Sequence, residues 1–143
     1  MKPSDPNNED DVIEINGNSK GEALHKFLSD NTNVEWGIVK TGDLNNETGG
    51  KAYIDTSHQY GKFSFEDIYS KIGEQNNLPN VFEESHNHNN GTTDPSPADK
   101  SHYNDLHKLT RHSVRTYIYT KEGGQYIQYN MCGSYLELIK LIK

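Results

Sequence analysis

The sequence predicts a single domain of the α/β or α+β class, with a mixed β-sheet flanked by helices. Three observations predict this class. Segments with helical spacing of apolar residues alternate along the chain with shorter segments typical of strands. Two strand-like segments in the C-terminal part are joined by a glycine-containing turn, which is typical of a β-hairpin. The chain has 143 residues, 31% of them hydrophobic, which suffices for one domain with a modest core.

The N-terminal segment, residues 1–18, is rich in Asn, Asp, Glu, Pro and Ser, so we expect a flexible polar lead-in. The folded domain is then expected over residues 19–143. Its first helix begins with a capping-box pattern at residues 19–22 and extends to about Ser29. Three apolar residues at helical spacing support it: Leu24, Phe27 and Leu28. His25 lies off this stripe and is expected to be a solvated surface histidine.

The middle of the chain predicts two strands, a helix and a third strand. Residues 34–41 and 51–56 are expected to be paired strands, because turn-forming residues separate them. The helix begins with Ser64 as its N-cap and ends at Gly73. Residues 81–88 follow as the third strand.

The C-terminal part predicts a helix, a hairpin and a last helix. Ser96 is a favourable N-cap for a helix over residues 97–109, which has proline at its first position. Residues 114–120 and 125–131 alternate around a Lys-Glu-Gly-Gly turn and are expected to form the hairpin. A short apolar helix is expected over residues 134–143.

Two histidines and one aspartate form a candidate metal site. In a strand, residues two apart share a face, so His86 and His88 point to the same side. Turn-forming residues follow His88, and Asp99 lies in the first turn of the helix that Ser96 caps. Two imidazoles and one carboxylate leave one position of a tetrahedral Zn²⁺ open for water, as in catalytic zinc sites. The pattern therefore predicts a hydrolytic site that binds Zn²⁺.

Two glutamates are candidates for the general base at this site. Glu35 shares a strand face with Gly37 and Val39, an unusual position for a carboxylate unless that face borders a cleft. Glu84 shares a face with both histidines and is the second candidate, either as the base or as a partner that orients a ligand imidazole. The residues by themselves leave this choice open.

The spacing of the site residues resembles the JAMM motif of the JAB/MPN+ metalloproteases. The residues occur in the order His86-x-His88, seven residues, Ser96-x-x-Asp99. The resemblance extends over residues 34–109 and is closest to the JAB-like domains that end bacterial polymorphic toxins. The chain differs from the family pattern in two places. Asn89 stands where the family often has proline, and Glu35 lies two residues before the glycine instead of three.

The resemblance implies a JAB/cytidine-deaminase-like fold and a role for each site residue. His86, His88 and Asp99 would hold Zn²⁺, which lowers the pKa of its bound water to about 7. Glu35 would accept the proton of this water and pass it to the leaving amine, while the Ser96 hydroxyl donates to the oxyanion. The expected reaction is cleavage of a peptide or isopeptide bond, as in the deubiquitinating members of the family.

The resemblance also implies a biological setting. The chain is expected to be the toxin domain of a larger bacterial effector that acts on a protein or peptide substrate in the cytoplasm of a target cell. A cognate immunity protein is the expected partner. No segment approaches the roughly 20 apolar residues of a membrane span, and the polar first residues do not resemble a signal peptide, so we expect a soluble domain. Export would then depend on a larger parent polypeptide or a dedicated apparatus.

Two other functions remain open at this stage. The His/Asn-rich run at residues 86–89 is similar to that of small metal-dependent toxin nucleases, although the net charge of −7 disfavours nucleic acid as a partner. A metal-free MPN-type binding module would share the fold, but all three ligand residues are present in this chain. The single cysteine, Cys132, excludes an internal disulfide and a cysteine-based zinc site.

Overall fold

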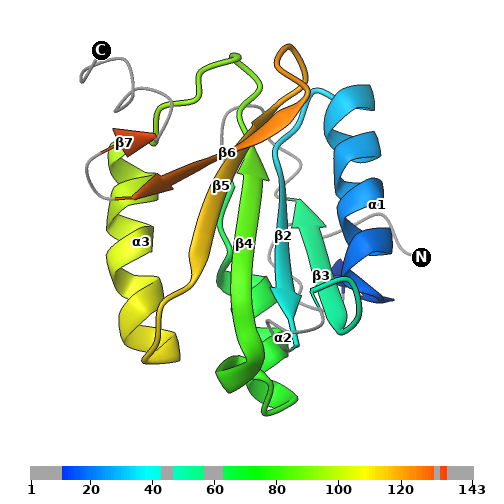
Figure 1. Ribbon diagram of the computed structural model, residues 1–143, viewed down its shortest axis with the longest axis vertical. Helices are drawn as coiled ribbons and strands as arrows, with labels where there is room; N and C mark the ends of the chain where they lie inside the picture. Colours follow the sequence, from blue (N-terminus) through cyan, green and yellow to red (C-terminus); the bar gives the residue numbers. More distant parts are fainter. Residues whose placement is uncertain (1–10, 43–46, 57–62, 131–132, 135–143) are drawn as a thin grey trace.

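The computed structural model describes residues 11–42, 47–56, 63–130 and 133–134. The strands are β1 (Ile13–Asn16), β2 (Trp36–Thr41), β3 (Lys51–Thr56), β4 (Val81–Asn87), β5 (Arg115–Thr120), β6 (Gln125–Asn130) and β7 (Gly133–Ser134). The helices are α1 (Asn18–Asn31), α2 (Glu66–Glu74), the 3₁₀ helix η3 (Leu78–Asn80) and α3 (Pro97–Thr110). These elements form one layer of strands covered by helices (Figure 1).

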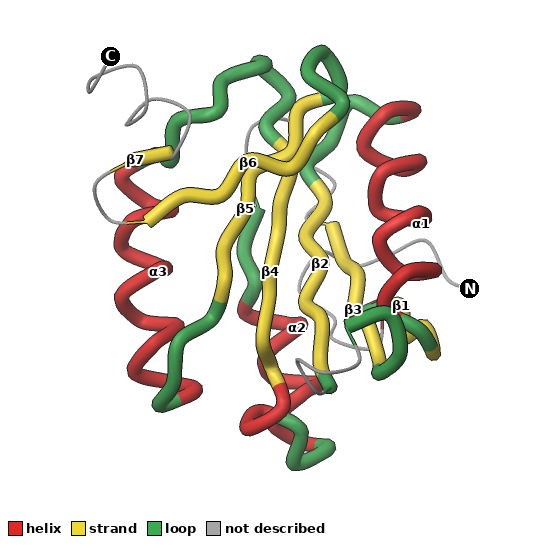
Figure 2. Tube along the Cα trace, viewed as in Figure 1, coloured by secondary structure: helices red, strands yellow, loops and turns green. Residues whose placement is uncertain are grey.

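The described strands form one mixed sheet in the order β1-β3-β2-β4-β5-β6-β7. Neighbouring strands are antiparallel except for β4 and β5, which are parallel. Helix α1 covers one face of the sheet, and α2 and α3 cover the other (Figures 1 and 2). The fold is therefore an α+β domain with a mixed sheet flanked by helices, and the predicted fold class is confirmed.

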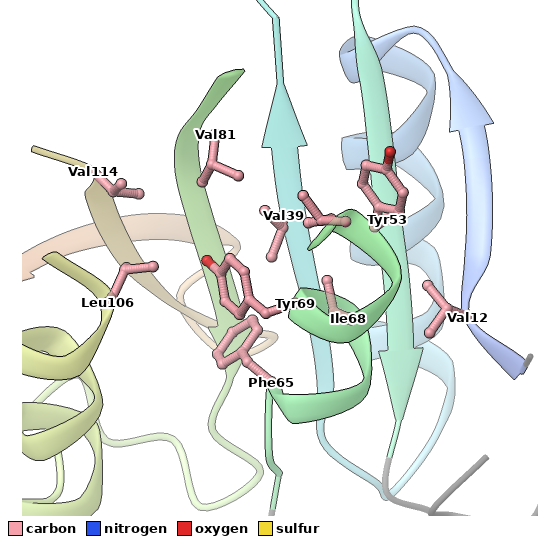
Figure 3. Packing of buried hydrophobic residues seen from close by; sticks show 10 residues of the cluster. Val12, Val39, Tyr53, Phe65, Ile68, Tyr69, Val81, Leu106 and Val114 are labelled. Atoms are coloured by element: carbon pink, nitrogen blue, oxygen red, sulfur yellow. The ribbon is translucent and has the colours of Figure 1, made fainter. Parts of the chain in front are cut away.

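Two apolar clusters hold the helices to the sheet. The larger one lies on the face covered by α2 and α3 (Figure 3). It includes Val39, Tyr53, Phe65, Ile68, Tyr69, Ile72, Val81 and Leu106. The smaller cluster lies under α1 and consists of Ile38, Ala52 and Ile54, with Leu24 and Leu28 packed against it. Because both faces of the sheet bury apolar surface, the central strands are removed from water on both sides.

Strand β4 is buried along its whole length although most of its residues are polar. It lies in the middle of the sheet between β2 and β5. Its interior residues include Glu83, Glu84, Ser85, His86 and Asn87. A buried polar group is costly unless it has a partner, so this strand indicates a functional site in the centre of the fold.

The prediction of a flexible lead-in over residues 1–18 is wrong for the last part of that segment. Strand β1 pairs with β3 and places Ile13 opposite Ile54. Val12 is buried in the larger apolar cluster. These apolar residues are stabilised by contacts with β3, which lies far along the chain and which local composition does not reveal. Residues 1–10 lie outside the described residues.

Helix α1 differs from the prediction in its start and in the face that it buries. It begins at Asn18 without a side-chain cap, so the predicted capping box at residues 19–22 is wrong. Gly21 packs closely on the sheet, since an added Cβ would come within 2.4 Å of the Ala52 side chain. The buried stripe of the helix is Asn18, Gly21, His25 and Ser29. Phe27, which was expected to face the core, is 62% exposed.

His25 is fully buried, so the prediction of a solvated histidine is wrong. Its Nε2 lies 2.9 Å from the carbonyl oxygen of Trp36 and must donate, because a carbonyl only accepts. Its Nδ1 then accepts from the Tyr126 hydroxyl at 2.8 Å. Burial lowers the pKa of the imidazole to about 4, so the ring is neutral near pH 7.

We expect His25→Gln to lose less stability than the native protein when the pH is lowered. The pKa of His25 is lower in the folded state than the ordinary value of 6.5, so its contribution to stability is complete above pH 6.5 and is lost as the pH falls towards 4. This difference in pKa corresponds to about 3 kcal/mol. Denaturant unfolding at pH 7 and pH 4 should show the native protein losing about 3 kcal/mol more free energy of unfolding than the variant. Equal losses in the two proteins would contradict the burial of a neutral His25.

The other predicted elements differ from the structure mainly at their ends. Strands β3 to β6 and helix α3 lie within one residue of their predicted bounds. The strand predicted over residues 34–41 begins at Trp36. Helix α2 begins at Glu66 with Phe65 at the N-cap position, and the predicted cap residue Ser64 accepts from the Glu66 amide at 3.2 Å. The helix predicted over residues 134–143 lies outside the described residues, except for Ser134, which belongs to β7. Among the helices that the structure describes, none is long and apolar enough to span a membrane.

Candidate metal centre

The end of β4 and the start of α3 bring two histidines and one carboxylate together. The Nε2 atoms of His86 and His88 lie 3.0 Å apart, on one side of the strand as predicted. Asp99 approaches both, with Oδ1 at 3.1 Å from His86 Nε2 and Oδ2 at 3.0 Å from His88 Nε2. Within the described ranges these residues are the one group of at least three His, Cys, Asp or Glu residues whose donor atoms all lie within 4.8 Å.

The donor atoms of this group fit a transition-metal ion. Their separations of 3.0 to 3.1 Å are close to the roughly 3.3 Å between ligand atoms in a tetrahedral zinc site. Only one proton can lie between the two facing Nε2 atoms, whereas a cation would be bound by both nitrogen lone pairs and by the carboxylate. Imidazole and carboxylate ligands suit zinc and several other transition metals, so the donor set defines a metal site without defining the metal.

The start of α3 positions Asp99 through its backbone. The Ser96 Oγ accepts a hydrogen bond from the Asp99 amide at 3.1 Å, and the Asp99 Oδ2 accepts one from the Ser96 amide at 2.8 Å. Pro97 occupies the first turn, where its missing N–H costs no helical hydrogen bond. This reciprocal capping box confirms the predicted helix start. The loop between β4 and α3 runs along one end of the sheet (Figure 2). The cap at the start of α3 thereby lies beside the histidines, which Asp99 contacts.

Contacts outside the donor group orient the two imidazoles. The Nδ1 of His88 lies 3.0 Å from the carbonyl oxygen of Thr92 and must therefore donate. This tautomer leaves the His88 Nε2 lone pair for a metal. The ring of His86 packs between two aromatic rings, with centroid distances of 6.0 Å to Phe65 and 6.3 Å to Tyr129. The interplanar angles of 83° and 86° describe edge-to-face contacts that restrict rotation of the ring.

The electrostatics of the group favour a negative carboxylate between the imidazoles. Burial raises the pKa of Asp99, but the hydrogen bonds with His86 and His88 outweigh this effect and hold the pKa well below its usual range. Burial lowers the pKa of His86, but the hydrogen bond and the charge of Asp99 reverse the shift, so its pKa is raised. The negative charge of Asp99 therefore favours a positively charged group, such as a metal ion, beside the imidazoles.

Glu35 lies beside this group, one residue before β2. The ladder between β2 and β4 ends at the pair Gly37 and His86, so Glu35 and His88 both lie just beyond this end of the ladder. Burial raises the pKa of the Glu35 carboxyl; His86 and His88 lower it, and Asp99 raises it, which shows that the charges of the group act on Glu35. The donor group is therefore part of the electrostatic environment of Glu35, the first candidate base.

Glu84, the second candidate, is engaged in another cluster. It accepts a hydrogen bond from the Tyr69 hydroxyl at 2.6 Å and lies 2.9 Å from His102 Nε2. Its side chain is 1% exposed. The His102 ring also stacks on Phe65, with centroids 4.9 Å apart. His102 therefore links α3 to β4 and α2.

A cavity of about 210 Å³ opens beside the metal-site residues. It is lined by Phe63, Ser64, Phe65, His86, Ala98, Asp99 and His102. Gly37 makes room for its aromatic wall, since an added Cβ would come within 2.3 Å of the Phe63 ring. The cavity shares Ser64, Phe65 and His102 with a larger one of about 470 Å³ that is lined by α2 and α3. These cavities offer room for substrate side chains next to the candidate metal ligands.

The fold and the site together define the class of this protein, which is an α+β domain with a candidate transition-metal centre. At this centre, two histidines at the end of the central strand meet the carboxylate of the following helix. The family model described as JAB-like toxin 1 matches residues 13–125, and the chain belongs to this family. The matched region contains all five predicted site residues: Glu35, His86, His88, Ser96 and Asp99. The resemblance to JAB-like bacterial toxins is therefore confirmed. No curated protein and no solved structure matches the chain.

Proposed function

We propose that this chain is a zinc-dependent hydrolase that cleaves a peptide or isopeptide bond. The observation that carries the proposal is the convergence of His86, His88 and Asp99 in a domain of the JAB-like toxin family. A buried carboxylate, Glu35, lies just beyond the end of the β2–β4 ladder at which Gly37 pairs with His86, and a cavity opens beside the group. A metal group, a base and a substrate cavity together are the minimum that metal-assisted hydrolysis requires.

In this proposal the Nε2 atoms of both histidines and an Asp99 oxygen hold the zinc. When bound, zinc supplies a Lewis acid that polarises a substrate carbonyl and activates water. The Thr92 carbonyl keeps His88 in the tautomer that can bind metal, and Ser96 holds the backbone of Asp99. The ligands are therefore arranged before any metal binds.

Glu35 and Ser96 perform the proton transfer and the charge stabilisation in this proposal. Glu35 accepts a proton on its carboxylate and later donates it to the leaving amine, and burial raises its pKa towards the working range of a general base. The Ser96 Oγ accepts from the Asp99 amide, so its own proton remains for donation to the negative oxygen that develops on the substrate carbonyl. The cavity lined by Phe63, Phe65 and Ala98 receives the residue next to the scissile bond.

The family membership supports a role as the toxin domain of an effector. We propose that a larger bacterial polypeptide carries the domain into the cytoplasm of a target cell, where it cleaves a protein or peptide. A cognate immunity protein would protect the producing cell, and occlusion of the cavity beside Asp99 would be the simplest way to inhibit the domain.

Metal analysis of the purified protein, followed by substrate assays, tests the proposal. We expect one zinc per chain and hydrolysis of ubiquitin-like chains or generic peptides that a chelator abolishes and zinc restores. Cleavage of nucleic acid with the same metal dependence would instead establish a metal-dependent nuclease. A folded protein that binds no metal would establish a binding module, and both of these results would contradict the proposal.

Replacement of Ser96 by alanine is expected to affect stability and activity by different amounts. The lost N-cap should lower the free energy of unfolding by about 1 kcal/mol. The lost hydroxyl donor should lower kcat per zinc-loaded folded chain by roughly 10²- to 10³-fold. Ser96→Thr keeps both the cap and the hydroxyl and should restore most of each. An activity loss that only follows the folded fraction would mean that Ser96 has a purely structural role.

A further inference from the structure

The segment that carries Glu35 is irregular, and side chains hold much of its backbone. Residues 33–35 lie outside the strands and helices, just before β2. Four consecutive carbonyl oxygens accept side-chain hydrogen bonds: Asn33 from Asn89 Nδ2 at 2.9 Å, Val34 from Asn87 Nδ2 at 3.3 Å, Glu35 from Thr56 Oγ1 at 2.6 Å and Trp36 from His25 Nε2 at 2.9 Å. Such a run of side-chain donors defines the path of the backbone as it enters β2, where residues 33–35 have no strand partner.

Asn87 is the central residue of this arrangement. Its Oδ1 accepts from the Trp36 amide at 2.5 Å, while its Nδ2 donates to the Val34 carbonyl. One buried amide therefore holds the backbone on both sides of Glu35. The same Nδ2 lies 3.1 Å from the Asn89 Oδ1, which couples the two asparagines.

The carboxylate of Glu35 depends on this backbone for its position. It is buried, and in the part of the chain that the structure describes no side chain donates a hydrogen bond to it. Glu35 also precedes Gly37 and the first ladder pair of β2, so the regular sheet begins only after it. Whatever holds the peptide groups next to Glu35 therefore decides where the carboxylate lies relative to His86 and His88.

In the run His86-Asn87-His88-Asn89, alternating residues have two different roles. Its histidines point to the metal group, and its asparagines bind the segment of Glu35. We propose that Asn87, assisted by Asn89, is a positioning residue that places the Glu35 carboxylate beside the metal ligands. The inference rests on the proposed role of Glu35 as the base. It also gives a structural role to Asn89, which stands where the family often has proline.

The test compares Asn87→Ala and Asn87→Asp with the matched control Asn80→Ala. Asn80 is exposed, and its side chain bonds only locally to Asn77. In Asn87→Ala we expect zinc content and KM to be unchanged and kcat to fall by up to about 100-fold, because a small displacement of the base is sufficient. Asn87→Asp keeps the acceptor for the Trp36 amide and should lose less. The control should behave as the native protein.

Two measurements separate positioning from a general structural role. Amide hydrogen exchange of Trp36 should become about tenfold faster in Asn87→Ala, and remain native in Asn87→Asp and Asn80→Ala. In a Glu35→Gln background, Asn87→Ala should cause no further loss of kcat, since it acts through the carboxylate that is already absent. Independent, multiplicative losses in the double variant would overturn the inference.

The exchange measurement needs no substrate, so it distinguishes two kinds of failure. If the native protein hydrolyses none of the amide substrates, the proposed function fails even when Trp36 exchange responds as expected. If the native protein is active but Trp36 exchange is the same in Asn87→Ala and the control, the positioning inference fails alone. If Asn87→Ala does not fold, the test uses Asn89→Ala and Asn87→Asp instead. A kcat equal to that of the native protein in both of these variants would overturn the inference.

Discussion

Replacement of His86 or Asp99 by alanine is expected to abolish stoichiometric zinc binding while leaving a folded domain. Each residue supplies one of three donor atoms, and loss of even an outer partner of a metal ligand costs 10- to 100-fold in affinity, so loss of a ligand should cost at least about 100-fold. Metal analysis after gel filtration, with circular dichroism of the same samples, measures both expectations. Full zinc retention in both variants would contradict the ligand assignment.

His107→Ala is the matched control, because His107 lies on α3 but bonds to the Tyr103 carbonyl and the Val114 amide instead of the metal group. It should keep one zinc per chain. Asp99→Asn preserves an acceptor for the capping box and separates loss of the ligand charge from loss of the cap.

Zinc content of the native protein should also fall as the pH is lowered towards about 5, since protons compete for the imidazole nitrogens. The raised pKa of His86 means that this competition begins above the ordinary value of 6.5, whereas the lowered pKa of Asp99 keeps the carboxylate ionised throughout. A zinc content that stays constant down to pH 5 would argue against imidazole ligands.

Glu35→Gln is expected to keep the fold and the zinc but to lose most hydrolysis. Glutamine has nearly the same shape but cannot accept or return a proton, and removal of a general base typically costs 10²- to 10⁴-fold in rate. Because the replaced carboxylate is buried and its pKa is raised by burial, the neutral amide should not lower stability. Measurement of kcat, zinc content and the free energy of unfolding on the same preparation tests these expectations.

Glu84→Gln provides the contrast. The Glu84 carboxylate accepts from Tyr69 and pairs with His102, so its loss should lower the free energy of unfolding by roughly 1 to 3 kcal/mol. Its effect on kcat per zinc-loaded folded chain should be small. If Glu84→Gln loses the activity and Glu35→Gln keeps it, the assignment of the base to Glu35 is wrong, and the shortened spacing to Gly37 would explain the error.

The correct predictions concern patterns that are local in the chain. Alternation in a strand places His86 and His88 on one side, and the spacing of Ser96 and Asp99 defines a capping box, whatever the rest of the protein does. The Lys-Glu-Gly-Gly turn likewise predicts the β5–β6 hairpin from neighbouring residues. Such features depend on bonds and side chains a few residues apart, so they can be read without the fold.

The wrong predictions concern residues whose partners are distant in sequence. His25 was expected in water, but it bonds to Trp36 and Tyr126, residues that only the folded sheet brings near. Helix α1 buries a small and polar stripe because Gly21 allows close approach to Ala52, so Leu24 and Leu28 lie at the edge of the contact and Phe27 faces solvent. Composition likewise could not show that β1 adds to the edge of the sheet at β3.

By itself, the sequence determined which residues can bind a metal and that two of them share a face, because donor chemistry and strand periodicity are local properties. The tertiary structure decided that Asp99 meets both histidines, that Asn87 holds the backbone on both sides of Glu35, and that Glu84 pairs with His102. These three contacts join elements between which local periodicity carries no information. The approach of these elements is set by burial of the shared apolar clusters, which depends on the whole chain.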